Sequence, residues 1–471
     1  MEEFKYEGLW WLPEDPSTKI SGTLIYDPKT GGRLELIGTF KTFEDLKHFN
    51  KESLSSSLII ILGLSVEGKS ITLYKCFETS FSLSFPGVAR SAFFVNIIFI
   101  GCHFNREEDI MLDEVSINYS NLREWAGISG FTRNTEFDQN DHLKKISISY
   151  EYPSAISSKL EMGSIHLDFH FNSTSELSYA FNYEQMTFFK IVPNTPHNLI
   201  WFLDEVMNNL RDFVSLAIGQ ASYPNIILSK SKSCYTKLAN GDIILNDIFI
   251  YHRIGPFIEP SKPIYPHEML FTLKDIMPSF GLVINNWITK AVILQPIYDL
   301  YFGTLYNPSL HINYQFLNLI QSLESFHRRI FGGKYILDED YDSQRNSFIS
   351  AILPNTAIGF RESLCNKITY LNEYSLSKRL KDIIEKHSEI VKASINATAD
   401  FIRDTVETRN YLTHYDEKLK ARAKKGHDIY WLSQKIRLLL EICLLSELGI
   451  PDETVKNLIT RNQKHRELLL H

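Results

Sequence analysis

The sequence contains few cysteines and no cluster of metal-binding ones. Its five cysteines, Cys76, Cys102, Cys234, Cys365 and Cys443, are scattered and lack any C-x-x-C spacing. This pattern predicts neither a disulfide framework nor a zinc cluster, and it is typical of a protein in a reducing compartment. We therefore expect no metal site and no cofactor.

The sequence also lacks a recognisable targeting or membrane segment. The N-terminus, Met1-Glu2-Glu3-Phe4-Lys5-Tyr6-Glu7, has neither a basic region nor an apolar stretch of the kind found in secretory signals. The longest apolar runs fall far short of a membrane span. These absences predict a cytoplasmic protein that makes no membrane contact.

What is present is ordinary globular material in more than one domain. With 471 residues the chain exceeds the usual size of one core, and 44% hydrophobic with 22% charged residues is typical of folded proteins. The net charge of −7 argues against a protein coated in nucleic acid. Residues 311–471 nevertheless carry a small positive excess, which favours local contact with phosphate.

Periodicity divides the chain into three parts. Alternating apolar and polar residues predict a β-rich domain over 1–192, either a sandwich or barrel-like, and Asp27–Gly32 is expected to be a hairpin turn. A mixed region over 193–308 follows, with a helix predicted at 278–305 and interrupted at Pro296. Residues 309–471 show helical spacing throughout. The predicted fold class is α+β, ending in an all-α bundle.

Residues Gly63–Ser70 match the phosphate-loop pattern G-x-x-x-x-G-K-S. A phosphate loop must lead into a helix whose N-terminal amides hold the phosphates. Here the alternating, β-branched stretch Ile71–Cys76 follows, which predicts a second strand, so Val66–Lys69 is better explained as a hairpin turn. Nucleotide binding at this loop remains an alternative.

The stretch Arg409–Asp416 places an arginine and a histidine five residues apart where a predicted helix ends. His414 can transfer a proton near neutral pH, and Arg409 can bind phosphate oxygens through two parallel hydrogen bonds. Such a pair suits phosphoryl transfer without metal. RNA is the expected substrate, because its 2′-hydroxyl is a nucleophile beside every phosphate. By itself the R-x-x-x-x-H pattern is weak.

The residues around this pair strengthen the pattern. The sequence Arg-Asn-Tyr-Leu-Thr-His-Tyr-Asp resembles the signature of HEPN ribonuclease domains, in particular the C-terminal domain of ApeA-type prokaryotic antiphage proteins. The similarity continues upstream in Leu323–Arg329 and in Phe331-Gly332-Gly333, which resemble the first long helix of that domain and its glycine cap. Gly8–Pro13 and Ser21–Leu24 resemble the start of the ApeA N-terminal domain.

The resemblance implies roles for several residues. Arg409 and His414 would be catalytic and Asn410 would face the site or brace the histidine. Two copies of the motif would face each other across a homodimer. Glu324 and His327 would support the site by orienting His414, although a structural salt bridge explains them equally well, and Tyr415 is a further supporting candidate.

A basic run follows the motif. It comprises Lys418, Lys420, Arg422, Lys424 and Lys425. These side chains would hold flanking RNA phosphates, or they form a solvated surface.

The resulting expectation is a metal-independent endoribonuclease that arrests growth of an infected cell. Its partners would be RNA, with transfer RNA among the candidates, a second copy of the chain and a phage-derived activator. The rivals are a HEPN module that binds nucleic acid or protein without catalysis, a regulator that binds NTP through Gly63–Ser70, and a domain that transfers a nucleotide monophosphate or acts as an antitoxin-controlled toxin.

Overall fold

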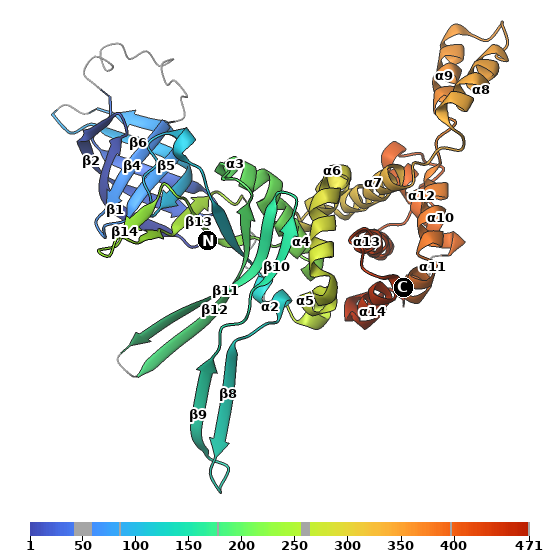
Figure 1. Ribbon diagram of the computed structural model, residues 1–471. Helices are drawn as coiled ribbons and strands as arrows, with labels where there is room; N and C mark the ends of the chain where they lie inside the picture. The colour runs from blue at the N-terminus through green and yellow to red at the C-terminus, as the bar shows by residue number, and fades with distance from the viewer. Residues whose placement is uncertain (42–58, 84–85, 177–178, 256–263, 396–397, 470–471) are drawn as a thin grey trace. The chain divides into compact units, whose positions relative to one another are not determined.

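The computed structural model describes residues 1–41, 59–83, 86–176, 179–255, 264–395 and 398–469 (Figure 1). The chain divides into two compact units. The first contains residues 1–214, 222–266 and 272–274, and the second contains 215–221, 267–271 and 275–471. The region 193–308, expected to connect two domains, is thus shared between the two units.

The first unit begins with a closed barrel of six antiparallel strands. The strand order is β6-β3-β2-β1-β4-β5, and β5 pairs with β6 to close it. The strands are β1 (Phe4–Leu12), β2 (Asp15–Asp27), β3 (Gly31–Ile37), β4 (Ile59–Ser65), β5 (Ser70–Ser82) and β6 (Arg90–Ile100). The β-rich prediction is confirmed, and of its two forms the barrel is the one observed.

Alternation along the strands explains the barrel core. In β2, Ile20, Leu24 and Tyr26 are buried, while Ser21, Thr23 and Ile25 are more exposed. Trp10 fills the centre and is fully buried. It packs against Gly63, where an added Cβ would lie 2.3 Å from the indole ring, so a glycine is needed there.

The strand β6 also pairs with β16, the first strand of a larger outer sheet. The order from β6 outward is β16-β13-β7-β12-β11-β10. These strands are β7 (Glu114–Tyr119), β10 (Ile156–Leu160), β11 (Gly163–Glu176), β12 (Ala180–Pro193), β13 (Pro224–Lys230) and β16 (Ile248–His252). Because β6 pairs with strands of both parts, barrel and outer sheet form one hydrogen-bonded ladder.

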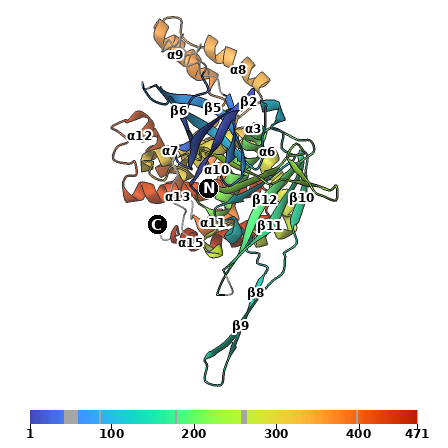
Figure 2. The same cartoon turned by 90° about the vertical axis from the view of Figure 1, so that its left-hand side faces the viewer.

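Two separate hairpins complete the β-rich region, and short helical segments occur within it and directly after it in the sequence. The strands β8 (Phe131–Phe137) and β9 (Leu143–Tyr150) form an arm that projects from the sheet, visible in Figures 1 and 2. The second hairpin joins β14 (Tyr235–Lys237) to β15 (Ile243–Leu245). The short segments are η2 (Glu107–Asp109), α2 (Leu122–Ala126), η4 (Pro266–Glu268), α5 (Leu273–Ile276) and η5 (Met277–Ser279).

One helical stretch connects β12 to β13 in the sequence. It runs through α3 (Leu199–Trp201), the π-helical turn η3 (Phe202–Met207) and α4 (Asn208–Ile218). Phe202, Val206 and Leu210 lie on its buried side. These buried positions recur at the spacing of one helix face, and the stretch contains a π-helical turn.

Two cysteines of the first unit are joined. Cys102 follows β6 and Cys234 precedes β14, and they form a disulfide across 132 residues of chain with Cα atoms 5.8 Å apart. Our expectation of unpaired cysteines is therefore wrong for these two, because folding brings together positions whose spacing in sequence carries no signal. Cys76, Cys365 and Cys443 are free thiols.

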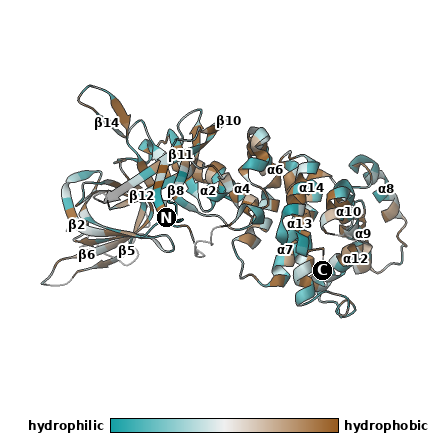
Figure 3. Cartoon of the chain, turned by 90° about the horizontal axis from the view of Figure 1, so that it is seen from below, coloured by the Kyte–Doolittle hydropathy of each residue, from teal (hydrophilic) through white to brown (hydrophobic). Residues whose placement is uncertain are grey.

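The second unit is helical, which confirms the prediction of an all-α bundle. Its helices are α6 (Phe280–Leu305), α7 (Ile312–Ile330), α8 (Asp338–Ser350), α9 (Ile358–Thr369), α10 (Leu376–Lys386), α11 (Ser388–Ser394), α12 (Ala399–His414), α13 (His427–Glu447), α14 (Asp452–Arg461) and α15 (Gln463–Glu467). The central helix α7 packs against α6, α10, α12 and α13. The long helices mix hydrophilic and hydrophobic residues, as Figure 3 shows. None of the helices in the described part of the chain has the length and apolar character needed to cross a bilayer.

The expected interruption at Pro296 does not occur, since α6 runs unbroken past it. A proline inside a helix removes one N–H and crowds the preceding turn. Here buried residues on both sides, Trp287 and Tyr301 among them, hold the helix in place. Arg329 of α7 also donates to the carbonyl of Ile293 in the disturbed turn, at 3.1 Å. Tertiary contacts thus override the local penalty.

Candidate functional site

The helix α12 carries the arginine and the histidine of the motif and ends directly after them. It is continuous from Ala399 to His414, and Tyr415 then adopts the left-handed conformation with φ of 53°. The Tyr415 N–H donates to the carbonyl of Tyr411 and closes the last turn, at 2.6 Å. Since five residues span about 140° around an α-helix, Arg409 and His414 leave α12 in different directions.

Arg409 is held against α7. Its Nη2 lies 3.3 Å from Glu324 Oε2, and both side chains are partly buried. Its Nη1 donates to Asn410 Oδ1 at 3.1 Å. The structure therefore places Asn410 beside the arginine, and it fixes one side of the guanidinium by a carboxylate.

His414 is exposed and unengaged. Within the described ranges its imidazole forms no hydrogen bond or ion pair. We expected Glu324 and His327 to orient this histidine, and the structure differs: Glu324 contacts Arg409, and His327 is buried elsewhere. The reason is that α7 packs on the side of α12 that carries Arg409. His414 is consequently free to meet a ligand or another subunit.

His327 sits in a buried polar cluster of the α7 and α10 helices. Its Nε2 donates to Asp382 Oδ2 at 3.1 Å, and its Nδ1 accepts from Arg379 Nη1 at 3.1 Å. Burial lowers the pKa of His327, so the ring is neutral at physiological pH. The described residues contain no group of three or more His, Cys, Asp and Glu side chains arranged to hold a metal ion.

Sequence reasoning missed Arg379 and Asp382. The signal was present in α10, where Leu376, Leu380 and Ile383 define a buried face at helical spacing. Arg379 lies on that same face, between these apolar residues. An arginine at a core position needs partners, and that requirement was the available clue.

The basic run after α12 is mostly engaged with acidic side chains of its own surroundings. These pairs are Lys420 with Glu417, Arg422 with Glu407 and Lys424 with Asp404, at 3.0–3.2 Å. The Glu407 and Asp404 carboxylates belong to α12, so these contacts attach the loop to the helix that carries the motif. The run is thus a structured loop beside the site.

The remaining two lysines and an aromatic pair lie in the same loop region. Lys425 Nζ donates to the carbonyl of Lys420 and lies over the ring of Tyr411, 5.4 Å from its centre. Tyr415 is 65% exposed and meets Tyr411 edge to face. Lys418 is exposed, and its backbone N–H donates to the Asp416 side chain. Charge and aromatic surface therefore both lie next to His414.

The glycine-containing loop of the barrel is a hairpin turn, as predicted. Strand β4 ends at Ser65 and β5 begins at Ser70, with no helix between or after them. The amides that would cradle a phosphate are used internally, since Gly68 N–H donates to Ser65 and Val66 N–H to Glu7. The loop therefore lacks the geometry of a phosphate loop, which the nucleotide-binding alternative requires.

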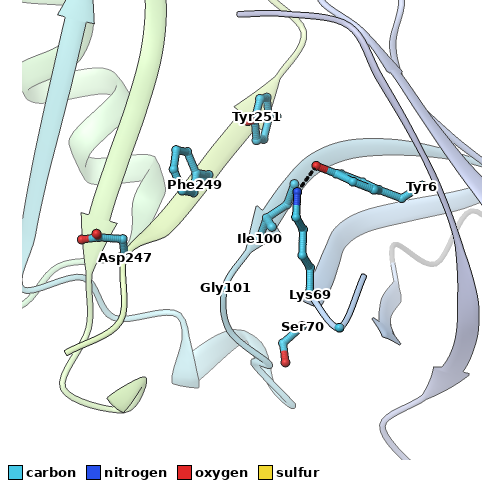
Figure 4. Close-up of a pocket in the computed structure, with 9 residues that line it drawn as sticks. Tyr6, Lys69, Ser70, Ile100, Gly101, Asp247, Phe249 and Tyr251 are labelled. Carbon is cyan, nitrogen blue, oxygen red and sulfur yellow. Dashed lines mark hydrogen bonds between the residues drawn. The ribbon is translucent and has the colours of Figure 1, made fainter. Parts of the chain in front are cut away.

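Lys69 of this turn lines an open pocket of about 380 Å³. Figure 4 shows its ammonium directed at the hydroxyl of Tyr6, with Phe249 and Tyr251 of β16 across the pocket. The lysine also lies over the Tyr6 ring. The ammonium of Lys69 thus interacts with Tyr6 through both a hydrogen bond and a cation–π contact.

Comparisons with known families agree with the resemblance seen in the sequence. The family model described as ApeA N-terminal domain 1 matches residues 5–287, and the model described as Apea-like HEPN matches residues 317–454. Neither the curated proteins nor the solved structures contain a significant match. Because the first model alone covers more than half of the chain, this protein belongs to the ApeA family and is a HEPN-type antiphage defence protein.

Proposed function

We propose that this protein is a metal-independent endoribonuclease that acts in abortive infection. The observation that supports the proposal most is the pair of side chains at the end of α12. Arg409 is held in a defined orientation by Glu324, and the exposed imidazole of His414 has no competing partner among the described residues. One group suits charge stabilisation and the other suits proton transfer.

The proposed reaction is attack of an RNA 2′-hydroxyl on the adjacent phosphorus. His414 takes the proton from the hydroxyl while water protonates the leaving 5′-oxygen, or it gives a proton to that oxygen while water takes the hydroxyl proton. Arg409 binds the non-bridging oxygens as negative charge builds on them. The P–O bond to the 5′-oxygen breaks, and the products are a cyclic phosphate and a 5′-hydroxyl end.

The geometry of α12 favours a site composed of two subunits. Since Arg409 and His414 diverge by about 140° around an unbroken helix, one phosphate does not readily contact both from a single chain. A homodimer related by a two-fold axis would place Arg409 of one subunit opposite His414 of the partner subunit. The active form in this proposal is therefore a dimer through the HEPN domain.

The neighbouring loop would bind the RNA that flanks the cut. Lys418 follows His414 closely in the sequence, Arg422 and Lys424 are attached to α12, and Tyr411 and Tyr415 offer rings for base stacking. The carboxylate partners of Arg422 and Lys424 limit the net positive charge, which favours selective contact over general adhesion. Cytoplasmic RNA, with transfer RNA among the candidates, is the proposed substrate, and a phage-derived molecule is the proposed activator.

The test is to incubate the purified protein with total cellular RNA in EDTA and to map the cut ends. We expect discrete cuts that bear cyclic phosphate ends, and their loss in His414→Ala. His142→Ala removes another exposed histidine, in the β8–β9 arm, and should leave cutting unchanged. Cutting by His414→Ala at the wild-type rate would refute the assignment. RNA binding without cutting, both alone and in extract of infected cells, would point instead to a non-catalytic HEPN module.

A further inference from the structure

A buried arginine lies behind the proposed active site. Arg379 of α10 is 1% exposed, and a charged group in that position must have partners. Its Nε donates to the carbonyl of Tyr374 at 3.1 Å, and its Nη1 donates to His327 Nδ1 at 3.1 Å. Its Nη2 lies 3.8 Å from Glu373 Oε2. Each nitrogen of this guanidinium is therefore directed at a protein atom.

His327 links two side chains of α10, Arg379 and Asp382, through its two ring nitrogens. Because Nδ1 of His327 accepts from Arg379, its proton is on Nε2, which donates to Asp382. Lys378 Nζ holds the other oxygen of Asp382 at 2.6 Å. His327 is fully buried and stacks on the ring of Phe331, with centres 4.7 Å apart. The ring thus has one fixed orientation.

Glu324 connects this cluster to Arg409. It lies three residues before His327 on α7, and residues with that spacing share one face of a helix. Its carboxylate binds Arg409. Burial lowers the pKa of Arg379, and the negative charges of Glu324, Glu373 and Asp382 oppose that shift. Glu324 therefore binds the guanidinium of the motif from the same helix face that carries His327, which binds the buried guanidinium.

Gly333, after α7, makes room for the buried arginine. Gly333 has φ of 90°, and a Cβ added to it would lie 2.3 Å from Arg379 Nη1. Any side chain would push the guanidinium out of its place. The turn after α7 is consequently shaped around Arg379, in addition to ending the helix.

We propose that Arg379 is a positioning residue of the Arg409 site, acting through His327 and Glu324 to hold the Arg409 guanidinium in one orientation. The buried arginine fixes the face of α7 from which Glu324 projects. Glu324 then fixes Arg409, so that the guanidinium is already aligned when phosphate arrives. As an account of a catalytic site this rests on the proposed ribonuclease function, but the fixed orientation of Arg409 is measurable without RNA.

The first measurement is NMR of the full chain labelled with ¹⁵N-arginine, with the Arg409 Nη–H signals assigned by their loss in Arg409→Lys. In the wild-type protein we expect slow hydrogen exchange at this group. In Arg379→Met the exchange should speed up by about tenfold or more, since hydrogen bonds to charged groups contribute to order on that scale. Fast exchange in the wild type, as for a free arginine, would overturn the proposal before any variant is made.

Two further variants separate positioning from general stability. Arg379→Lys keeps the buried charge and loses the fork of hydrogen bonds, so it should fold and show an intermediate effect. Arg437→Met removes another largely buried arginine of the same unit, paired with Glu441 on α13, and should lower the melting temperature without changing Arg409 exchange. Unchanged exchange in both Arg379 variants would refute the role of Arg379.

The second measurement is RNA cleavage by the same proteins. We expect Arg379→Met to lower kcat about tenfold or more with little change in KM, because misalignment weakens contacts made in the transition state. An equal loss in Arg437→Met would mean that Arg379 acts only on stability. If wild-type protein fails to cut RNA under every condition, the proposed function falls, and the exchange measurement still decides the role of Arg379.

Discussion

Two inactive variants should restore each other's activity if each active site combines Arg409 of one subunit with His414 of the partner subunit. The reason lies in α12, which stays helical through His414 and sends the two side chains about 140° apart. A site within one chain would need a break between them, and the first turn outside helical geometry comes only at Tyr415. The perturbation is to mix Arg409→Ala chains with His414→Ala chains.

The expected recovery follows from counting subunits. Random pairing in equal amounts makes about half of the dimers mixed, and each mixed dimer has one intact site and one that lacks both groups. The preparation should therefore show about a quarter of the wild-type activity. A site within one chain predicts no recovery, since every chain lacks one of the two groups.

The assay is coexpression of the two variants with different affinity tags, followed by isolation of mixed dimers with both tags. In these isolated dimers the recovery should rise to about half of the wild-type rate per dimer, because one of two sites is intact. Each variant purified alone is the control for residual activity. Isolated mixed dimers that cut no faster than either variant would refute the composite site and with it the assignment of the dimer as the active form.

Two further predictions concern stability and cysteine chemistry. The helical unit should lose stability as the pH falls below about 6.5, the unperturbed pKa of histidine. Burial lowers the pKa of His327, His387 and His465 in the folded state, so the unfolded chain takes up protons first as the pH falls. Urea unfolding at pH 7.5 and 5.5 measures this stability, and an equal or higher free energy of unfolding at the lower pH would contradict the prediction. Thiol titration of the denatured, unreduced protein should find Cys76, Cys365 and Cys443 but not the joined pair. Closing a loop of 132 residues contributes about 5 kcal/mol in the chain-entropy model, so reduction should lower the unfolding free energy of the barrel unit, and five thiols before reduction would show that the disulfide is absent.

Local pattern was sufficient to predict the general fold. Alternation along the N-terminal strands and helical spacing after residue 309 reflect which side chains face a core, and that constraint acts residue by residue. The turn at Val66–Lys69 could be recognised for the same reason, since Ile71–Cys76 alternates as a strand does. The closure of the barrel could not, because the β5–β6 pairing that seals it depends on register across the whole domain.

The contacts of the candidate site could be predicted from the sequence only in part, for a physical reason. Arg409 and His414 carry a short signature at a helix end, which a single sequence displays. The partner of Glu324 depends on which face of α12 packs against α7. The rotation of α12 about its own axis sets that face, and the sequence does not reveal it. The predictions of an interruption at Pro296 and of unpaired cysteines were wrong for a related reason. In both cases contacts between distant segments outweighed the local preference.

The shared strand β6 has a mechanical consequence for the N-terminal unit. The β11–β12 hairpin extends well beyond its support, because β7 pairs only with residues 189–191 of β12. From there an uninterrupted ladder leads through β13 and β16 into β6 and so into the barrel wall. The hairpin and the barrel are thus joined by one continuous backbone ladder, whose narrowest links are the three residue pairs between β12 and β7 and the two between β13 and β16.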